Sequence, residues 1–213
     1  NLHAGAEDIL ALSNLSSKDN LFRIDCSEIK DRVESHPWIS QAAVYRRFPS
    51  TVVIDVSEWR PVMAANSGEG TLHLVSESGE VFKPAALSEA SGLPLLAGLT
   101  ETELTRGSVR AREGIANALD VLAISRSAGI PGGRAISEIE IIGAGADVAV
   151  LFSGEGRTGP YVLLGPPPFD EKWQRLGRLW SDLDSRDVQP ARIQFVSDAR
   201  AVVVPTGRGA AKI

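Results

Sequence analysis

A glycine-rich stretch is the first place in this chain where residue types and spacing suggest chemistry. Residues 154–159 have the spacing G-x-G-x-x-G. In a dinucleotide site, such glycines and the N-terminus of a following helix bind a pyrophosphate. Here Pro160 to Leu164 has the apolar pattern of a strand instead of a helix. The stretch is therefore predicted to be a hairpin loop, and no cofactor is expected.

The histidines and the cysteine do not form a recognisable catalytic or metal site. His3, His36 and His73 lie far apart and have no Cys, Asp or Glu at metal-ligand spacing. No G-x-S-x-G nucleophile motif occurs. Cys26 falls in the first turn of a predicted helix, where a thiol can be activated, but partial burial as a small apolar side chain is the simpler interpretation. We predict no catalytic residue and no metal, so the protein is expected not to be an enzyme.

Composition narrows the class of protein further. The chain has 213 residues, of which 43% are hydrophobic and 23% charged, enough for one or two ordinary cores. Its net charge of −5 argues against nucleic-acid binding, which usually requires a basic face. No apolar run reaches the roughly 18 residues of a membrane-spanning helix, and the first residues do not resemble a signal peptide.

Residues 25–62 contain the clearest succession of elements. Asp25 is predicted to cap a helix together with Glu28, three residues later. This helix must end before Pro37. Residues 52–56 then alternate between apolar and polar types as a strand does, and residues 48–51 read as the turn of a hairpin. A shorter helix at about residues 6–15, capped by glycine, comes before this segment.

This segment resembles a known family. PWI at residues 37–39, AV at 43–44, RRFP at 46–49, TVVI at 51–54 and EWRPV at 58–62 are similar in order and spacing to a run in the bacterial cell-division family FtsQ, called DivIB in Gram-positive bacteria. In that family the run is the second half of a POTRA domain, a β-α-α-β-β module. Members begin this module with a strand that follows one membrane-spanning helix. We therefore expect a fragment whose anchor and first strand are missing.

The rest of the chain continues the resemblance as a sheet-rich β-domain. The small polar residues 65–70 are interpreted as a connection between units. A hairpin is expected at residues 72–82, helices at 111–127 and 170–184, and strands at 136–142, 148–152, 161–164, 191–196 and 201–204. The blocks LPLLAG, ISEIEI, VLLG, EKWQRLGRLWSDL and RIQFVSDARAVVV resemble successive parts of the FtsQ β-domain. Trp173 and Trp180, at helical spacing with Leu176 and Leu183, are predicted to lie in the core rather than form a ligand cage.

The predicted fold class is therefore α+β, with three segments. Residues 1–64 are expected to form a POTRA-like domain without its first strand, residues 65–204 a mixed α/β β-domain, and residues 205–213 a flexible tail. Trp38 is expected to be buried where the second helix meets the hairpin.

The resemblance implies a non-enzymatic scaffold of the divisome. It would be the extracytoplasmic part of a single-pass inner-membrane protein at the division septum, located in the periplasm. It would bind FtsB and FtsL and link early and late division proteins, without a nucleic-acid or small-molecule ligand. Two alternatives remain open at this point: an outer-membrane assembly or secretion protein with POTRA modules, and an unrecognised enzyme.

The resemblance also indicates where partners would bind. In the family, the last strand of the β-domain receives a strand from FtsB, helped by an arginine and an aromatic residue. Those positions correspond to Val196 and Ser197 here, so the charge contact cannot be carried over. Backbone pairing depends less on side chains. We therefore predict Phe195 and Val203 as apolar contacts and Arg200 as the replacement cation.

The complete set of predicted partner-binding residues in the last two strands is Ile193, Phe195, Val196, Ser197, Arg200, Ala201, Val202, Val203 and Val204. A second surface is predicted on the POTRA-like domain. There the adjacent Arg46 and Arg47 would contribute to recruitment of the protein through a salt-dependent contact.

Overall fold

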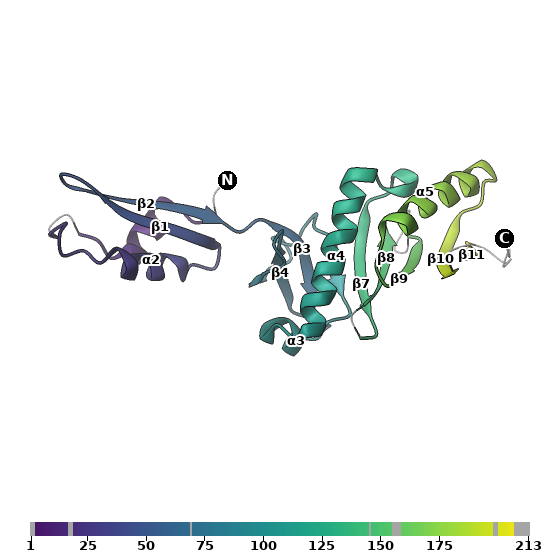
Figure 1. The fold of residues 1–213 in the computed structure, drawn as a ribbon, viewed down its shortest axis with the longest axis horizontal. Coiled ribbons are helices and arrows are strands. Elements are labelled where there is room, and N and C mark those ends of the chain that lie inside the picture. Colours follow the sequence, from purple (N-terminus) through teal and green to yellow (C-terminus); the bar gives the residue numbers. More distant parts are fainter. Residues whose placement is uncertain are drawn as a thin grey trace. The chain divides into compact units, whose positions relative to one another are not determined.

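The computed structural model describes residues 3–16, 19–68, 70–144, 146–154, 159–197 and 200–206, and divides the chain into two compact units. Unit 1 is Asn1–Arg60 and unit 2 is Pro61–Ile213. Figure 1 shows the elements of each unit. The division lies after Arg60, whereas the sequence analysis placed it after Ala64.

Unit 1 contains two helices followed by a hairpin. The helices are α1 (Ala6–Ser13) and α2 (Cys26–Glu34), and the antiparallel strands are β1 (Ile39–Arg47) and β2 (Thr51–Glu58). As predicted, the Asp25 side chain caps α2 by accepting hydrogen bonds from the N–H groups of Ser27 and Glu28. The Glu28 carboxylate bonds to Arg32 instead of completing a capping box. The helix ends before Pro37, whose ring disfavours a helical conformation in the residue before it.

A small core holds the elements of unit 1 together. Its buried side chains are Ala4, Ile29, Val33, Ile39 and Ala42, and Val44, Ile54 and Val56 of the hairpin pack against them. An isolated two-stranded hairpin has marginal stability in water. The packing of α1 and α2 on one face of the hairpin is therefore what makes unit 1 stable.

Trp38 lies at the margin of this core, in the loop between α2 and β1. Its side chain is 7% exposed, and its ring stacks on the imidazole of His3 with centroids 3.6 Å apart. The Trp38 carbonyl accepts a hydrogen bond from the N–H of Trp59 at 2.9 Å. Glu58 accepts the N–H of Ala4 at 2.7 Å. The first described residues are thereby attached to both strands at the open end of the hairpin, where Ile39 pairs with Glu58.

Unit 2 is built on one nine-stranded mixed sheet with the order β11-β10-β9-β8-β7-β6-β3-β4-β5. The β3–β6, β6–β7 and β9–β10 pairs are parallel and the other pairs are antiparallel. The strands are β3 (Pro61–Asn66), β4 (Leu72–Ser76), β5 (Val81–Ala85), β6 (Leu95–Ala97), β7 (Ile136–Ile142), β8 (Asp147–Phe152), β9 (Tyr161–Gly165), β10 (Pro190–Ser197) and β11 (Arg200–Pro205).

The sheet confirms the predicted hairpin at residues 154–159 and corrects the predicted connection between units at residues 65–70. β8 and β9 are antiparallel neighbours, so the glycine-rich stretch joins them as a hairpin, although residues 155–158 lie outside the described residues. The predicted connection at residues 65–70 is wrong. Ala65 is fully buried in β3, and Asn66, the last residue of that strand, pairs with Leu72 at the start of β4.

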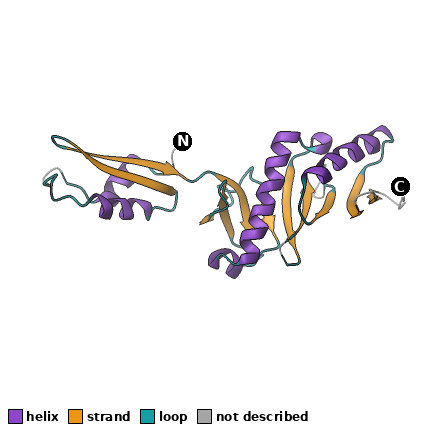
Figure 2. Cartoon of the chain, viewed as in Figure 1, coloured by secondary structure: helices purple, strands orange, loops and turns teal. Residues whose placement is uncertain are grey.

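Helices cover one face of this sheet, as Figure 2 shows for α4 and α5. They are α4 (Val109–Ala128) and α5 (Asp170–Ser185), with the shorter α3 (Glu101–Arg106) and the 3-10 turn η1 (Pro131–Gly133) beside them. Trp173, Leu176, Trp180 and Leu183 are at most 3% exposed, which confirms that this stripe of α5 belongs to the core. The Trp173 indole N–H donates to the carbonyl of Gly129, just after α4, at 2.9 Å.

Among the described helices, none combines the length and apolarity needed to cross a bilayer.

The start of α3 contains a charged capping network that the sequence analysis did not predict. The Glu103 carboxylate accepts the N–H of Thr100 at 2.9 Å and two hydrogen bonds from Arg110 at 2.8 Å. The backbone N–H of Thr100 and the Arg110 guanidinium lower the pKa of Glu103 from 4.5 to about 2. The ionised carboxylate therefore stabilises the junction of α3 and α4.

We expect Trp38→Ala to destabilise unit 1 by about 3 kcal/mol, because it removes a nearly buried aromatic side chain. Chemical denaturation followed by far-UV circular dichroism measures the change. Trp59→Ala is the comparison, since Trp59 is only half-buried and should cost less. An equal or smaller loss for Trp38→Ala would mean that its ring does not stabilise the unit.

We expect Glu103→Gln to lower the melting temperature by about 3 °C at neutral pH, because charge-assisted hydrogen bonds are lost. A carboxylate whose pKa is lowered in the folded state contributes stability above its unfolded pKa and loses it as the pH falls through the folded pKa. The difference from the parent should thus disappear between pH 4.5 and about 2. Thermal unfolding across this range is the measurement, with the exposed Glu113→Gln as control. A difference that persists at pH 2 would contradict this role of the charge.

Candidate functional site

The two edges of the nine-stranded sheet differ in their ability to accept another strand. At one edge, β5 contains Pro84, which has no N–H to donate, and Lys83 forms an ion pair with Glu89 at 2.6 Å. Prolines and charges on an edge strand hinder pairing with another chain. At the other edge, β11 has the sequence RAVVVP, with its proline at the last position and one charge at the first. The edge at β11 is therefore the open one.

The side chains of β11 alternate between the core and the surface. Val203 is 2% exposed and belongs to the core, whereas Val202 and Val204 on the other face are 43% and 42% exposed. The sequence analysis predicted Val203 as an apolar contact, and the structure corrects this, because its side chain already packs inside unit 2. Its neighbours Val202 and Val204 present the apolar surface instead.

The neighbouring strand β10 follows the same alternation. Ile193 is fully buried, and Phe195 packs against the core with the Arg175 guanidinium 5.1 Å from its ring centre. Phe195 is thus engaged within the unit rather than free as the predicted contact. Val196 is 56% exposed. Ser197 pairs with Arg200 in the backbone register, and its side chain lies outside the described residues.

The remaining predicted residues of this hairpin have distinct positions. Arg200 is exposed at the start of β11, and Ala201 packs partly against the core, paired with Phe195. The structure therefore gathers the predicted residues on one hairpin but divides them between two faces. Val196, Arg200, Val202 and Val204 are the side chains available to a partner there.

A polar row crosses the face of the sheet that carries Val204. Val204 of β11 pairs with Arg192 of β10, and Arg192 pairs with Tyr161 of β9. Tyr161 in turn pairs with Leu151 of β8. The Tyr161 hydroxyl donates to Glu140 of β7 at 2.8 Å, and the Arg192 guanidinium lies 5.3 Å from the Tyr161 ring centre. Burial and this hydrogen bond raise the pKa of Tyr161 to about 12. The phenol therefore stays protonated and acts as a structural donor, which fixes β9 and β10 beside the edge.

The second predicted surface, Arg46 and Arg47 of β1, is also divided by the structure. The Arg46 guanidinium donates to the carbonyl of Leu21 at 2.9 Å and to the carbonyl of Ile24. Arg46 therefore attaches the α1–α2 loop to the hairpin, and reversing its charge would disturb the fold. Arg47 is exposed and is the member of the pair that remains available for binding.

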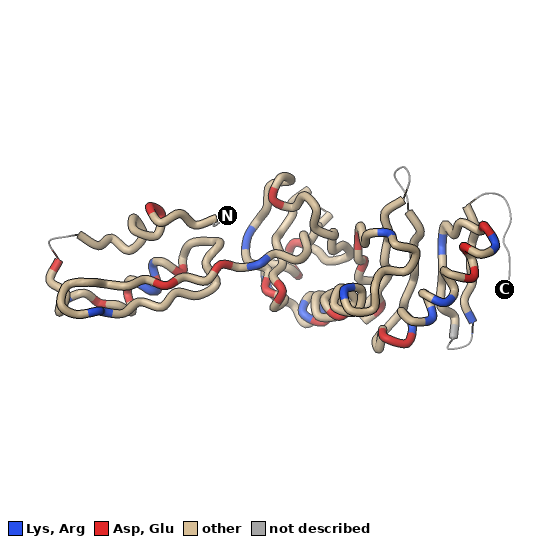
Figure 3. Tube along the Cα trace, turned by 90° about the horizontal axis from the view of Figure 1, so that it is seen from above, with Lys and Arg blue, Asp and Glu red and all other residues tan. Residues whose placement is uncertain are grey.

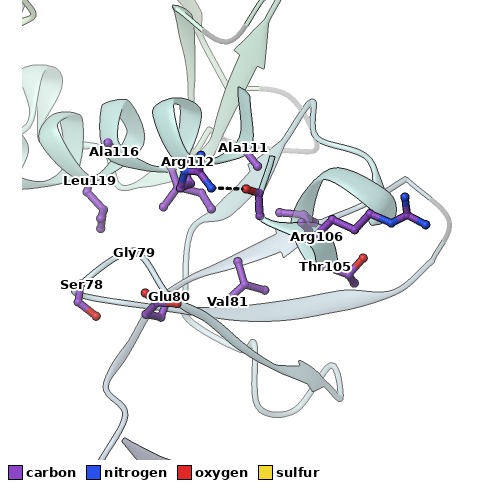
Figure 4. A pocket seen from close by; sticks show the side chains of 13 residues that line it. Ser78, Gly79, Glu80, Val81, Thr105, Arg106, Ala111, Arg112, Ala116 and Leu119 are labelled. Atoms are coloured by element: carbon purple, nitrogen blue, oxygen red, sulfur yellow. Dashed lines mark hydrogen bonds between the residues drawn. The ribbon is translucent and has the colours of Figure 1, made fainter. Parts of the chain in front are cut away.

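A cavity of about 550 Å³ lies at the end of unit 2 near β5 (Figure 4). It is formed by the β4–β5 turn, α3 and α4, with apolar Val81, Ile115 and Leu119 among its lining residues. Its Arg112 donates to the carbonyl of Gly107 at 2.6 Å. The two hydroxyl groups that line it, of Ser78 and Thr105, bond to the Ser76 hydroxyl at 2.8 Å and to the Glu101 carbonyl at 2.9 Å respectively. Neither of these partners is a general base.

His73 and His36 each form their own hydrogen bonds, in different parts of the chain. His73 is 5% exposed and bonds to Glu101 at 2.9 Å, and the His36 ring accepts the N–H of Trp38 at 3.3 Å. Within the described part of the chain, no group of three or more His, Cys, Asp or Glu could hold a metal ion.

Acidic and basic residues are interspersed along the described trace (Figure 3). Cys26 is a free, half-buried cysteine.

The fold defines a two-unit protein in which a POTRA-type unit is followed by a large mixed sheet. Comparison with known families supports both parts. The family model described as "POTRA domain, FtsQ-type" matches residues 1–59, and the one described as "Cell division protein FtsQ/DivIB, C-terminal" matches residues 64–196. The chain belongs to the FtsQ/DivIB family of cell division proteins, which confirms the resemblance seen in the sequence. The outer-membrane assembly alternative is thereby set aside.

Individual relatives agree with this assignment. The chain is 32% identical to the cell division protein FtsQ of Geobacter sp. over 83% of this chain and 62% of that protein. It is 29% identical to FtsQ of Myxococcus fulvus over 92% of this chain and 66% of that protein, and 31% identical to FtsQ of Anaeromyxobacter sp. over 85% and 60%. The chain thus spans about three fifths to two thirds of the length of these relatives.

We expect Val203→Asp and Val202→Asp to differ strongly in their effect on stability. The first places a carboxylate in the core and should cost about 3 kcal/mol or more, whereas the second faces solvent and should cost less than about 1 kcal/mol. Urea denaturation followed by the fluorescence of the buried tryptophans Trp173 and Trp180 measures both. Equal losses would contradict the assignment of the two faces.

Proposed function

We propose that this chain is a non-enzymatic scaffold of the divisome that binds FtsB-type and FtsL-type partners by strand addition to β11. In this proposal it is the extracytoplasmic part of a single-pass inner-membrane protein, anchored through a segment N-terminal to Asn1. It acts at the septum and links early and late division proteins. The observation that carries the proposal is the open edge of β11, with exposed Val202 and Val204.

The physical basis is the set of backbone groups that an edge strand leaves unpaired. Alternate residues of β11 direct their N–H and C=O groups towards β10, and the residues between them direct theirs away from the sheet. An added strand obtains affinity from these groups and specificity from the side chains that alternate along it. Val202 and Val204 would provide an apolar surface for the partner's side chains, and Arg200 a charge at the start of the edge.

A second docking function is proposed for unit 1, in recruitment to the division site. Arg47 supports it, because this arginine is exposed on β1. Arg46 contributes indirectly, since it holds the α1–α2 loop against the hairpin. Charge reversal at Arg47 alone should therefore affect recruitment without disturbing the fold, and mainly through its salt dependence.

We expect hydrogen exchange to show new protection at amides of Ala201 to Val204 when the extracytoplasmic segment of an FtsB-type partner is added. An added strand would bond to the outward-facing N–H groups, which exchange freely in the edge strand. Amide exchange followed by mass spectrometry or NMR, with and without the partner segment, is the measurement. Protection confined to the loop between β8 and β9 would place the partner elsewhere.

Proline substitution provides a matched pair of variants for the same edge. Of the adjacent residues Val202 and Val203, one directs its N–H to β10 and the other away from the sheet. Proline at the outward position should abolish partner-dependent protection while circular dichroism shows a folded unit, because only the outer hydrogen bond is lost. Proline at the inward position should also weaken the β10–β11 pairing. If both variants bind like the parent, strand addition at β11 is wrong.

A further inference from the structure

Two exposed phenylalanines lie together at the end of unit 1. Phe22, in the loop between α1 and α2, is 74% exposed, and Phe48, in the turn between β1 and β2, is 65% exposed. Their ring centroids are 5.7 Å apart. Neither belongs to the core of unit 1. Paired aromatic side chains held in solvent on two different segments indicate an interaction surface rather than a misplaced core.

The backbone on both sides of the pair is held in place. The Arg46 guanidinium bonds to the carbonyls of Leu21 and Ile24, which flank Phe22 in the sequence. Phe48 follows directly on the last β1–β2 pair, Arg47 with Thr51. The backbone segments that carry the two rings are therefore in place before any partner binds, which reduces the entropy lost on binding.

Cationic side chains flank both rings. Arg23 follows Phe22 and Arg47 precedes Phe48, and both are exposed. Within the described part of the chain, neither guanidinium forms a hydrogen bond or an ion pair. Asp19 and Asp25, which flank this part of the loop, accept backbone N–H groups from Ser16 and from Ser27 and Glu28 respectively and keep their negative charge. The charged side chains directly adjacent in sequence to the two rings are Arg23, Arg47 and no acid.

We infer that Phe22, Arg23, Arg47 and Phe48, here called the aromatic tip, bind a short segment of a partner protein in which an apolar side chain lies next to Asp or Glu. Phenylalanine and arginine are enriched at protein interfaces, and the guanidinium groups complement a carboxylate. This inference rests on the proposed docking function of unit 1. It assigns that function to the rings and the two flanking arginines, and gives Arg46 a positioning role.

A protein segment fits the aromatic tip better than a bilayer surface does. Stable membrane anchoring needs a larger apolar face or a cluster of several basic residues. The aromatic tip has two rings and two free arginines, on a chain whose net charge is −5. Two rings with flanking charges are instead typical of the small central contacts that dominate protein–protein binding.

The test uses the full-length protein in cells depleted of the native copy, with septal enrichment of a fluorescent fusion as readout. Phe22→Ser with Phe48→Ser should reduce enrichment about tenfold if the rings are the centre of the contact. Leu10→Ser is the matched control, because Leu10 is an apolar side chain of α1 that is 60% exposed and belongs to neither segment of the tip. Circular dichroism of the purified chain checks that each variant is folded. Arg23→Glu with Arg47→Glu should give a similar loss.

Two further measurements separate the possible outcomes. A photoreactive phenylalanine analogue at position 48 should form a protein adduct that disappears with Arg23→Glu and Arg47→Glu. Flotation with phosphatidylglycerol vesicles should show no binding that depends on Phe22 and Phe48, and such binding would overturn the inference in favour of a membrane. Replacement of residues 1–60 by an unrelated folded domain tests the docking function of unit 1 itself. If that replacement abolishes enrichment while the tip variants behave like the parent, the inference fails and the proposed function stands.

Discussion

An open β-sheet leaves one row of backbone N–H and C=O groups unpaired at each edge, and this constraint governs unit 2. The nine strands form an open sheet, so β5 and β11 each have one neighbouring strand only. The free side of an edge strand can pair with another chain. Pro84 and the Lys83–Glu89 ion pair make β5 a poor template for an added strand. β11 has three consecutive valines instead, at positions 202–204. Among the described strands none pairs with the outer side of β11, and its backbone groups there are those that a further strand could bond to.

The rest of unit 2 supports that edge. α4 and α5 cover one face of the sheet, and the buried stripe of α5 packs with the inner residues Ile193 and Val203 in one continuous core. The outer face is held by the bond between Tyr161 and Glu140 and by the stacking of Arg192 on Tyr161. β10 is thus held on both faces, and β11 is held on its inner face by Val203. A rigid edge loses less entropy when another strand is added than a mobile one would.

Unit 1 is stabilised by different means, because its sheet has only two strands. Its core is small, and several polar contacts supplement it. Arg46 attaches the α1–α2 loop to β1, and Glu58 and the ring of Trp38 hold Ala4 and His3 against the hairpin. These contacts join segments far apart in the sequence. They also explain how two phenylalanines can remain exposed side by side, since the backbone that carries them does not depend on burying their rings.

Local signals in the sequence determined most of the elements and the family. The Asp25 cap, the stop before Pro37 and the apolar stripe of α5 depend on residues within a few positions of each other, so they can be read without the fold. Other features depend on distant partners. β6 has three residues and exists because β3 and β7 lie on either side of it, and residues 65–66 resemble a linker until β3 is seen buried in the sheet. A run of three valines likewise does not reveal which side chain points inward. Only the tertiary structure decided that Val203 faces the core while Val202 and Val204 face outward, because the packing of α5 on one face of the sheet sets the direction.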